Sequence, residues 1–286
     1  MKPSSAALWV ALAVVALPAS ASPFFFSTGD PDGLMAMASR PPGAGLNEIE
    51  SADDFVLNTP TTIASGTFTG LIAGIGNVTI TDVRIEIYRV FPNDSDTTRT
   101  PQVTTRANSP SDVAFDEFDA ADSEISFSTT VLDASFTAAN SVLNGINPQP
   151  GQTTGGEGAV RGEEIRVNFT FTTPLTLAPD HYFFVPQISV ETGGQFFWLS
   201  APNPIVAPGT PFMPDLQTWI RNEDLAPDWS RVGTDIVGGS PAPHFNAAFS
   251  LTGATVPEPP TGALVAAALA GLALARRQRP LTVRGR

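Results

Sequence analysis

The chain of 286 residues has 15 basic and 28 acidic residues, a net charge of −13, and no cysteine. Between residues 22 and 255 the imbalance is larger, because 27 acidic residues face only nine arginines there. This charge disfavours nucleic acid and anionic lipid headgroups as partners, since binding either one needs a basic face. The lack of cysteine excludes disulfides, thiolate metal sites and cysteine nucleophiles.

Residues 1–21 have the features of a signal peptide. Lys2 supplies a positive charge, Ala6–Leu17 is an apolar run, and Ala19-Ser20-Ala21 is an A-x-A cleavage site. We therefore predict that the Sec translocon exports the chain across the inner membrane. Signal peptidase would then leave Ser22 as the first residue of the mature protein.

Residues 22–45 are rich in proline and glycine, which predicts an extended arm along the surface. A single domain, residues 46–253, follows, and about 210 residues suffice to bury one core. Residues 254–255 are a thin linker to the C-terminal tail. Polar or Pro/Gly-rich segments predict three loops inside the domain, at residues 92–112, 147–162 and 202–214.

Apolar and polar side chains alternate in several stretches of the domain, which is typical of half-buried strands. Residues 165–171 and 245–251 show this pattern without a break. In residues 78–91 the apolar positions change parity, which predicts a bulge near Thr81-Asp82. His181–Val190 is apolar at both parities and predicts a central strand, although Pro186 interrupts its ladder.

One short helix is predicted over Pro214–Glu223. The remaining pattern, many short strands between glycine and proline turns, predicts an all-β protein. The expected architecture is a single antiparallel β-sandwich of the jelly-roll type.

Several of these stretches resemble strands of secreted bacterial β-sandwich proteins. The resemblance agrees with the predicted fold and carries no functional residue to this chain. The stretches are Ala52-Asp53-Asp54-Phe55, Phe68-Thr69-Gly70, Val83–Tyr88, His181-Tyr182-Phe183 and Ala248–Gly253.

Candidate catalytic residues are few. His181 and His244 are the only histidines, and neither has metal-ligand spacing or a G-x-S-x-G partner. We expect both to lie at strand edges and the protein not to be an enzyme. A secreted glycan hydrolase stays as an alternative, because it needs only two carboxylates about 5–10 Å apart. Pairs such as Glu163-Glu164 and Asp116-Glu117 are unspecific in so acidic a chain.

Calcium is the one cofactor that the sequence leaves open. Asp94 and Asp96, separated by a serine, offer hard oxygen ligands in a predicted loop, as do Asp30-Pro31-Asp32-Gly33 and residues 116–122. None of these segments matches the EF-hand pattern. Aspartate and serine also form ordinary turns, which is the alternative interpretation.

Trp219 and Trp229 flank a polar segment that includes Asp228. An indole face beside carboxylates and amides can hold a sugar ring, so a carbohydrate-binding module is an alternative function. The favoured alternative is that both indoles staple a long loop onto the sandwich, because tryptophan is mostly buried. Trp198, between Phe197 and Leu199, is predicted to be core.

The C-terminal tail, residues 254–286, combines three features in order. Val256-Pro257-Glu258-Pro259 is followed by the apolar run Gly262–Ala275 and then by Arg276 and Arg277 at the start of a basic end, residues 276–286. The uncharged stretch from Pro259 to Ala275 gives roughly 25 Å of helix, slightly less than a bilayer core of about 30 Å. Arginines after it fit a cytoplasmic end. A buried alanine-rich helix of a soluble domain is the alternative.

This order resembles the PEP-CTERM sorting signal of Gram-negative bacteria. The resemblance implies that Val256–Pro259 is recognised by exosortase, that Gly262–Ala275 is a transmembrane hold, and that Arg276-Arg277 is its stop. It further implies a setting of exopolysaccharide and biofilm production. The sequence therefore predicts an exported, non-catalytic protein that is anchored by its C-terminal helix and then reaches the cell surface or extracellular matrix.

Overall fold

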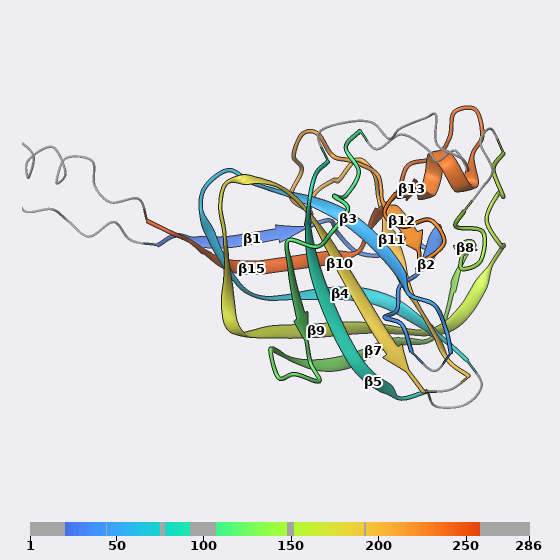
Figure 1. Ribbon diagram of the computed structural model, residues 1–286, viewed down its shortest axis with the longest axis horizontal. Coiled ribbons are helices and arrows are strands. Elements are labelled where there is room, and N and C mark those ends of the chain that lie inside the picture. Colours follow the sequence, from blue (N-terminus) through green and yellow to red (C-terminus); the bar gives the residue numbers. More distant parts are fainter. Residues whose placement is uncertain are drawn as a thin grey trace, which may run out of the picture. The chain divides into compact units, whose positions relative to one another are not determined.

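The computed structural model describes residues 21–43, 45–74, 78–91, 107–147, 152–191 and 193–257. Its compact unit, Pro23–Thr255, consists of two sheets packed as a β-sandwich, and the strands of one sheet cross those of the other (Figure 1). The nine-stranded sheet contains β1 (Pro23–Ser27), β2 (Met35–Ala38), β4 (Thr61–Ala73), β7 (Ile125–Ala138), β8 (Asn140–Val142), β9 (Val160–Leu177), β11 (Gln195–Ala201), β14 (Asn246–Ala247) and β15 (Phe249–Thr255). The six-stranded sheet contains β3 (Ile49–Leu57), β5 (Ile80–Arg89), β6 (Asp116–Asp119), β10 (Asp180–Val190), β12 (Trp219–Asn222) and β13 (Ser230–Arg231).

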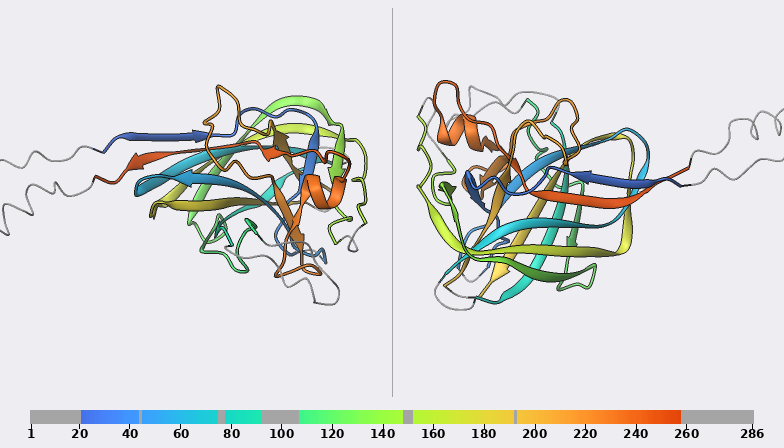
Figure 2. Two further views of the ribbon diagram at one scale, coloured as in Figure 1. Left: turned by 90° about the horizontal axis from the view of Figure 1, so that it is seen from above. Right: turned by 180° about the vertical axis from the view of Figure 1, so that it is seen from behind.

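Strand β4 organises the larger sheet. On one side it pairs with β9, which in turn pairs with β7; on the other side it pairs first with β15 and then with β11. The smaller sheet has the order β13-β12-β3-β10-β5-β6. Strand β1 pairs with β15, and Figure 2 shows these two strands extending side by side from one end of the sandwich.

Aromatic rings from both sheets fill the space between them. Phe184 of β10 stacks on Phe169 of β9 at 5.6 Å and on Phe249 of β15 at 5.0 Å between ring centroids. Trp198 is fully buried, as predicted, and its indole nitrogen donates to the carbonyl of Ala248 at 3.0 Å. In the absence of cross-links, this aromatic packing provides much of the apolar burial that stabilises the fold.

Several predicted strand features are confirmed. The apolar positions of residues 165–171 are all buried. The bulge near Thr81-Asp82 is present, because the pairing of β10 with β5 skips one residue between Asp82 and Ile80. Strand β10 is central, between β3 and β5. The carbonyl of Pro186 in this strand accepts a hydrogen bond from Ser39 Oγ at 2.6 Å.

One predicted helix and two predicted segments outside the domain are wrong. Residues 214–223 do not form a helix, because Trp219–Asn222 is extended and pairs with β3; the short helix in the described part of the chain is a π-helix at Val232–Val237. Residues 22–45 are not only a surface arm, since β1 joins the sheet and all four residues of β2 are buried. Residues 254–255 are no linker, because they continue β15 against β4.

The three predicted loops agree with the structure to different extents. Residues 202–214 contain no strand or helix. Residues 147–162 are a loop only up to the start of β9 at Val160, with residues 148–151 outside the described part. Most of residues 92–112 also lie outside the described residues.

Glycine is required in β4 where an aromatic ring lies against the backbone. A Cβ at Gly70 would lie 2.1 Å from Phe196 Cε2 and 2.7 Å from the carbonyl oxygen of Phe197. We expect Gly70→Ala to lower the free energy of unfolding by about 1–3 kcal/mol, because the core is overpacked. Urea unfolding followed by tryptophan fluorescence measures this change. Gly43→Ala is the control, since no atom lies within 4 Å of its Cβ position, and a loss equal to that of Gly70→Ala would contradict the packing argument.

Candidate functional site

Trp219 and Trp229 lie together on the outer face of the smaller sheet, but neither is exposed. Their exposed fractions are 2% and 0%, and Asp228 is also buried at 1%. The ring of Trp229 meets Tyr88 edge-on, with 5.4 Å between ring centroids. The predicted sugar-binding platform is therefore wrong, because the chain folds back over this face and covers both indoles. The burial agrees with the alternative, in which they fasten a loop to the sandwich.

Beneath Trp229 lies a buried polar network centred on Arg221 of β12. Its guanidinium binds the carboxylate of Glu50 through both Nε and Nη2, the second at 2.9 Å from Oε1. The Tyr88 hydroxyl donates to Glu50 Oε1 at 2.6 Å and lies 3.2 Å from Glu86 Oε2. The guanidinium carbon sits 4.3 Å from the centre of the Trp229 ring, which adds a cation–π contact. Each of these residues is less than 10% exposed.

The charge state of the network follows from burial. Burial, and then the negative charge of Glu50, raises the pKa of Glu86 to about 9, so this carboxyl keeps its proton at neutral pH. Burial also raises the pKa of Tyr88, which stays a hydrogen-bond donor. For Arg221, burial alone would lower the pKa, but the hydrogen bond and charge of Glu50 outweigh it and the pKa is raised. The network thus contains one charged pair, Arg221 and Glu50, held among neutral donors.

Sequence reasoning missed this network, although a local signal was present. Glu50, Glu86 and Arg221 stand at outward positions of three strands of the smaller sheet, each next to at least one isoleucine of the same strand. A charged residue in so apolar a strand needs a partner when it is buried. What the sequence could not show is which partner, because β3 and β12 are far apart along the chain.

The second polar cluster starts from the consecutive Asp53 and Asp54 of β3, whose side chains point to opposite faces of the strand. Asp53 accepts hydrogen bonds from the backbone nitrogen of Ala247 at 2.8 Å and from Thr218 Oγ1 at 3.4 Å. Asp54 Oδ2 lies 2.5 Å from His181 Nε2 and accepts from the backbone nitrogen of Leu216 at 3.3 Å. Both carboxylates therefore hold the segment of Leu216 and Thr218 to β3, and Asp53 also holds Ala247 of β14.

These aspartates also have perturbed acidities. Burial and the charge of Asp54 raise the pKa of Asp53 well above its ordinary value. Burial raises the pKa of Asp54 to about 6, although the hydrogen bond and charge of His181 act in the opposite direction. Among the hydrogen bonds of the described residues, the His181 imidazole has Asp54 as its side-chain partner and no serine or threonine hydroxyl. His181 lies at the start of β10, and His244 is exposed just before β14.

The predicted loop at residues 116–122 is wrong in its first half, because Asp116–Asp119 is strand β6; Asp32 and Asp119 of the acidic segments act as turn formers. Asp32 Oδ1 accepts from the backbone nitrogen of Leu34 at 2.9 Å and from Ser200 Oγ at 2.5 Å. Asp119 Oδ1 accepts from the backbone nitrogen of Ala121 at 2.7 Å. Within the described ranges no group of three or more histidine, aspartate or glutamate side chains is arranged to hold a metal ion. The predicted ligands Asp94 and Asp96 lie outside the described residues.

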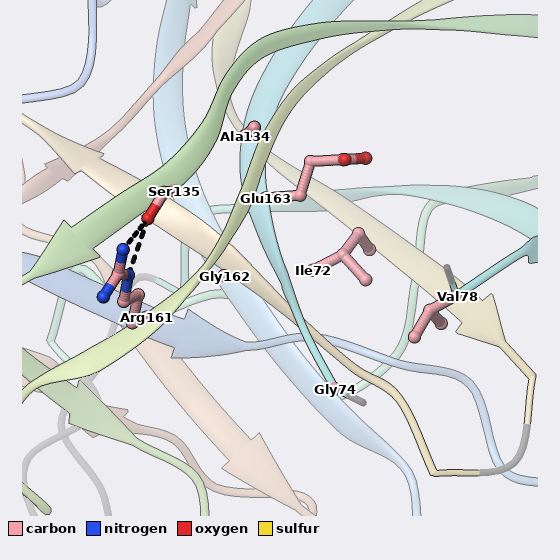
Figure 3. A pocket seen from close by; sticks show the side chains of 8 residues that line it. All are labelled: Ile72, Gly74, Val78, Ala134, Ser135, Arg161, Gly162 and Glu163. Atoms are coloured by element: carbon pink, nitrogen blue, oxygen red, sulfur yellow. Dashed lines mark hydrogen bonds between the residues drawn. The ribbon is translucent and has the colours of Figure 1, made fainter. Parts of the chain in front are cut away.

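The surface is hollowed beside the end of β4, where a cavity of about 770 Å³ lies between β4, β7 and β9. Figure 3 shows Arg161 and Ser135 joined on one side, where Arg161 Nε donates to Ser135 Oγ at 2.6 Å, while Glu163 points away from them. Ile72 and Val78 provide apolar walls. The hollow thus has one engaged guanidinium and one carboxylate, and lacks a pair of facing acids among its described lining residues.

Comparison with known protein families found a match in the C-terminal tail. Residues 255–279 match the PEP-CTERM protein-sorting motif. The chain carries a PEP-CTERM sorting signal. The matched range includes the predicted recognition residues Val256–Pro259 and the predicted stop, Arg276-Arg277. The motif implies processing by an exosortase-type enzyme, together with export and anchoring through the C-terminal signal. No curated protein and no solved structure matches the chain.

The two ends of the chain are only partly described. Ala19 of the predicted cleavage site and the apolar run Gly262–Ala275 lie outside the described residues, whereas Ala21 and Ser22 directly precede β1. Among the described residues no helix is both long and apolar enough to cross a membrane.

The Arg221–Glu50 pair should be important for stability, because removing one partner leaves a buried charge. We expect Arg221→Met to lower the free energy of unfolding by about 3–5 kcal/mol in urea titrations. Arg166→Met is the matched control, since Arg166 pairs with Asp30 at 3.7 Å on the surface, and its loss should be at most about 1 kcal/mol. Similar losses for the two variants would contradict the role of the buried pair.

Stability should fall as the pH rises. Glu86 holds its proton up to about pH 9 in the folded protein but only to its ordinary value of 4.5 when unfolded, so the folded state binds more protons between these values. The raised pKa values of Asp53 and Asp54 act in the same direction. We expect the melting temperature to decrease from pH 5.5 to pH 8.5, with a slope in free energy of at most about 1.4 kcal/mol per pH unit for each group.

The Glu86→Gln variant isolates this contribution, because its amide stays neutral at every pH. Its melting temperature should depend less on pH than that of the wild-type protein, whereas the exposed control Glu163→Gln should keep the full dependence. A parallel pH profile for Glu86→Gln and wild type would show that Glu86 does not carry the effect.

Proposed function

We propose that this protein is a non-catalytic component of the cell surface or extracellular matrix, sorted by an exosortase and associated with exopolysaccharide or biofilm. The observation that carries the proposal is the match of residues 255–279 to the PEP-CTERM sorting motif. The proposal includes a cleaved signal peptide, the Sec translocon and signal peptidase as export partners, and a transmembrane helix over Gly262–Ala275. It also includes a jelly-roll arrangement of the sandwich.

The position of the chain ends in the sandwich supports this route. Pro23, two residues after the predicted signal-peptide cleavage site, pairs with Ala254, two residues before the sorting motif begins at Val256. Both predicted processing sites therefore adjoin the same end of the β1–β15 pair. A body that is held at this end can be anchored and released without any change in its own fold.

A non-catalytic role is supported by the state of the strongly perturbed carboxyl groups. Glu86 is 6% exposed, and Asp53 and Asp54 are 0% and 1% exposed. A hydrolase needs its acid and base open to substrate in a cleft. In the described part of this chain, these carboxyls instead hold strands and loops together. A role in display or adhesion needs only a stable, soluble body, which the acidic surface favours.

The sorting step is tested in the native cell by replacing Pro257, Glu258 and Pro259 with alanine. We expect the wild-type protein to lose its C-terminal residues and to appear at the surface or in the medium, and the triple variant to stay full-length in the membrane fraction. Pro280→Ala, one residue beyond the matched range, is the control and should be processed like wild type. Mass spectrometry of both chain ends after fractionation provides the measurement.

Full-length wild-type protein in the cytosol, with its leader uncut, would overturn the proposal. So would wild-type protein in the medium that still ends at Arg286, because anchoring and cleavage by the sorting enzyme would then play no part.

A further inference from the structure

Strand β7 is a long edge strand that is paired on one side only. Its fourteen residues, Ile125–Ala138, bond to β9 and to no other described strand (Figure 1). The other edge strands in the described ranges, β1, β6, β8, β13 and β14, have at most five residues. An unpaired edge presents a row of free backbone N–H and C=O groups that another strand can bind.

The middle of β7 also lacks cover on its two faces. Ser128–Ser135 are all exposed, whereas a strand in a sandwich normally buries every second residue. The register places Val131 beside the buried Ile165, on the inner side of the sheet, yet Val131 is 53% exposed. Leu132 is 41% exposed. This part of β7 therefore extends past the facing sheet and leaves apolar side chains in solvent.

Only half of this edge carries the features by which proteins usually block an open edge. Register shifts occur between Val131 and Asp133 and between Asp133 and Phe136, and Asp133 adds a charge there. Bulges and charges of this kind prevent strand addition. The preceding window, residues 125–131, has a regular register, no charge and no proline. It is therefore a regular and uncharged strand edge.

We propose that two copies of this chain pair antiparallel through residues 125–131 of β7, which joins their larger sheets into one. A twofold axis at Ser128 would place Val131 opposite Ile125 of the other copy, so that an apolar pair forms where Val131 is now exposed. The same axis places Asp133 beyond the paired window, so the Asp133 carboxylates of the two copies do not face each other. Cross-strand contacts among serine, threonine and β-branched residues stabilise such pairs.

The uncharged window is the part of β7 where the acidic charge of the body opposes a second copy least. Residues 22–255 have 27 acidic groups and nine arginines, so two bodies repel each other over most of their surface. The uncharged window is a place where that repulsion is small, and it offers no charge by which a basic or acidic strand of another protein would be selected. Identical strands that pair about a twofold axis form a closed interface.

Pairing of two acidic bodies through an uncharged window predicts how dimerisation depends on salt. Association should become tighter as salt is added, because screening weakens the repulsion between the acidic bodies and does not affect backbone hydrogen bonds. The processed protein from the native cell is studied by analytical ultracentrifugation at 50 mM and 500 mM salt. We expect a monomer–dimer equilibrium that shifts toward the dimer when the salt concentration is raised from 50 mM to 500 mM.

Ser128→Lys tests the surface, because it places two positive charges next to each other at the proposed axis. We expect at least a tenfold rise in the dissociation constant, with an unchanged melting temperature. Thr252→Lys is the matched control, since Thr252 is exposed on β15 but this strand is paired on both sides, by β1 and β4. Its dimerisation should match that of wild type.

A cysteine variant tests the register independently of Ser128→Lys. Because the chain has no cysteine, Ser128→Cys introduces a single thiol, and two thiols at the axis should form a disulfide-linked dimer when an oxidant is added. Thr252→Cys should stay monomeric under the same treatment. The test does not depend on the proposed surface role, since it reads only the association of the purified protein.

Three results would overturn the inference. The first is a wild-type protein that is monomeric at 500 mM salt and at the highest attainable concentration. The second is a dimer that persists unchanged in Ser128→Lys, or that cross-links as well through Thr252→Cys as through Ser128→Cys. The third is a complex in which the β7 edge of this chain pairs with a different protein and not with a second copy of the chain.

Discussion

Strand β3 is the constraint on which the rest of this structure depends, because it makes polar contacts on both of its faces. On the inner side Asp53 holds the backbone of β14, and Phe55 packs in the aromatic core. On the outer side Glu50 binds Arg221, and Asp54 binds His181 and the backbone of Leu216. A chain without disulfides has few other means of fixing long loops to a sandwich, and buried hydrogen bonds to carboxylates are among the stronger ones.

The same contacts explain how so acidic a chain folds around buried acids. Glu86 is neutral at physiological pH, and Glu50 is neutralised by the guanidinium of Arg221, so the outer network carries little net charge. Most of the other acids in the described ranges are exposed or half-buried, where water solvates them. The protein thus separates its carboxyl groups into a solvated majority that keeps it soluble and a buried minority that holds its segments in place.

The two ends of the folded unit and its open edge have different roles. Pro23 and Ala254 are partners at one end of the β1–β15 pair, where the predicted processing sites adjoin the body. Strand β7 borders the same sheet on the other side of β4 and β9, three strands away from β15. Contact through β7 and attachment through the chain ends would therefore use separate parts of the larger sheet and need not interfere with each other.

The sequence by itself determined the features that depend on neighbouring residues. Alternation identified the strand at residues 165–171 and the bulge near Thr81, and the order of motif, apolar run and arginines identified the sorting signal. Tertiary structure alone decided that Trp219 and Trp229 are covered, that Trp219–Asn222 is a strand, and that Arg221 faces Glu50. The physical reason is range: periodicity is a property of consecutive residues, whereas burial and ion pairing depend on which distant segment lies over each face of a sheet.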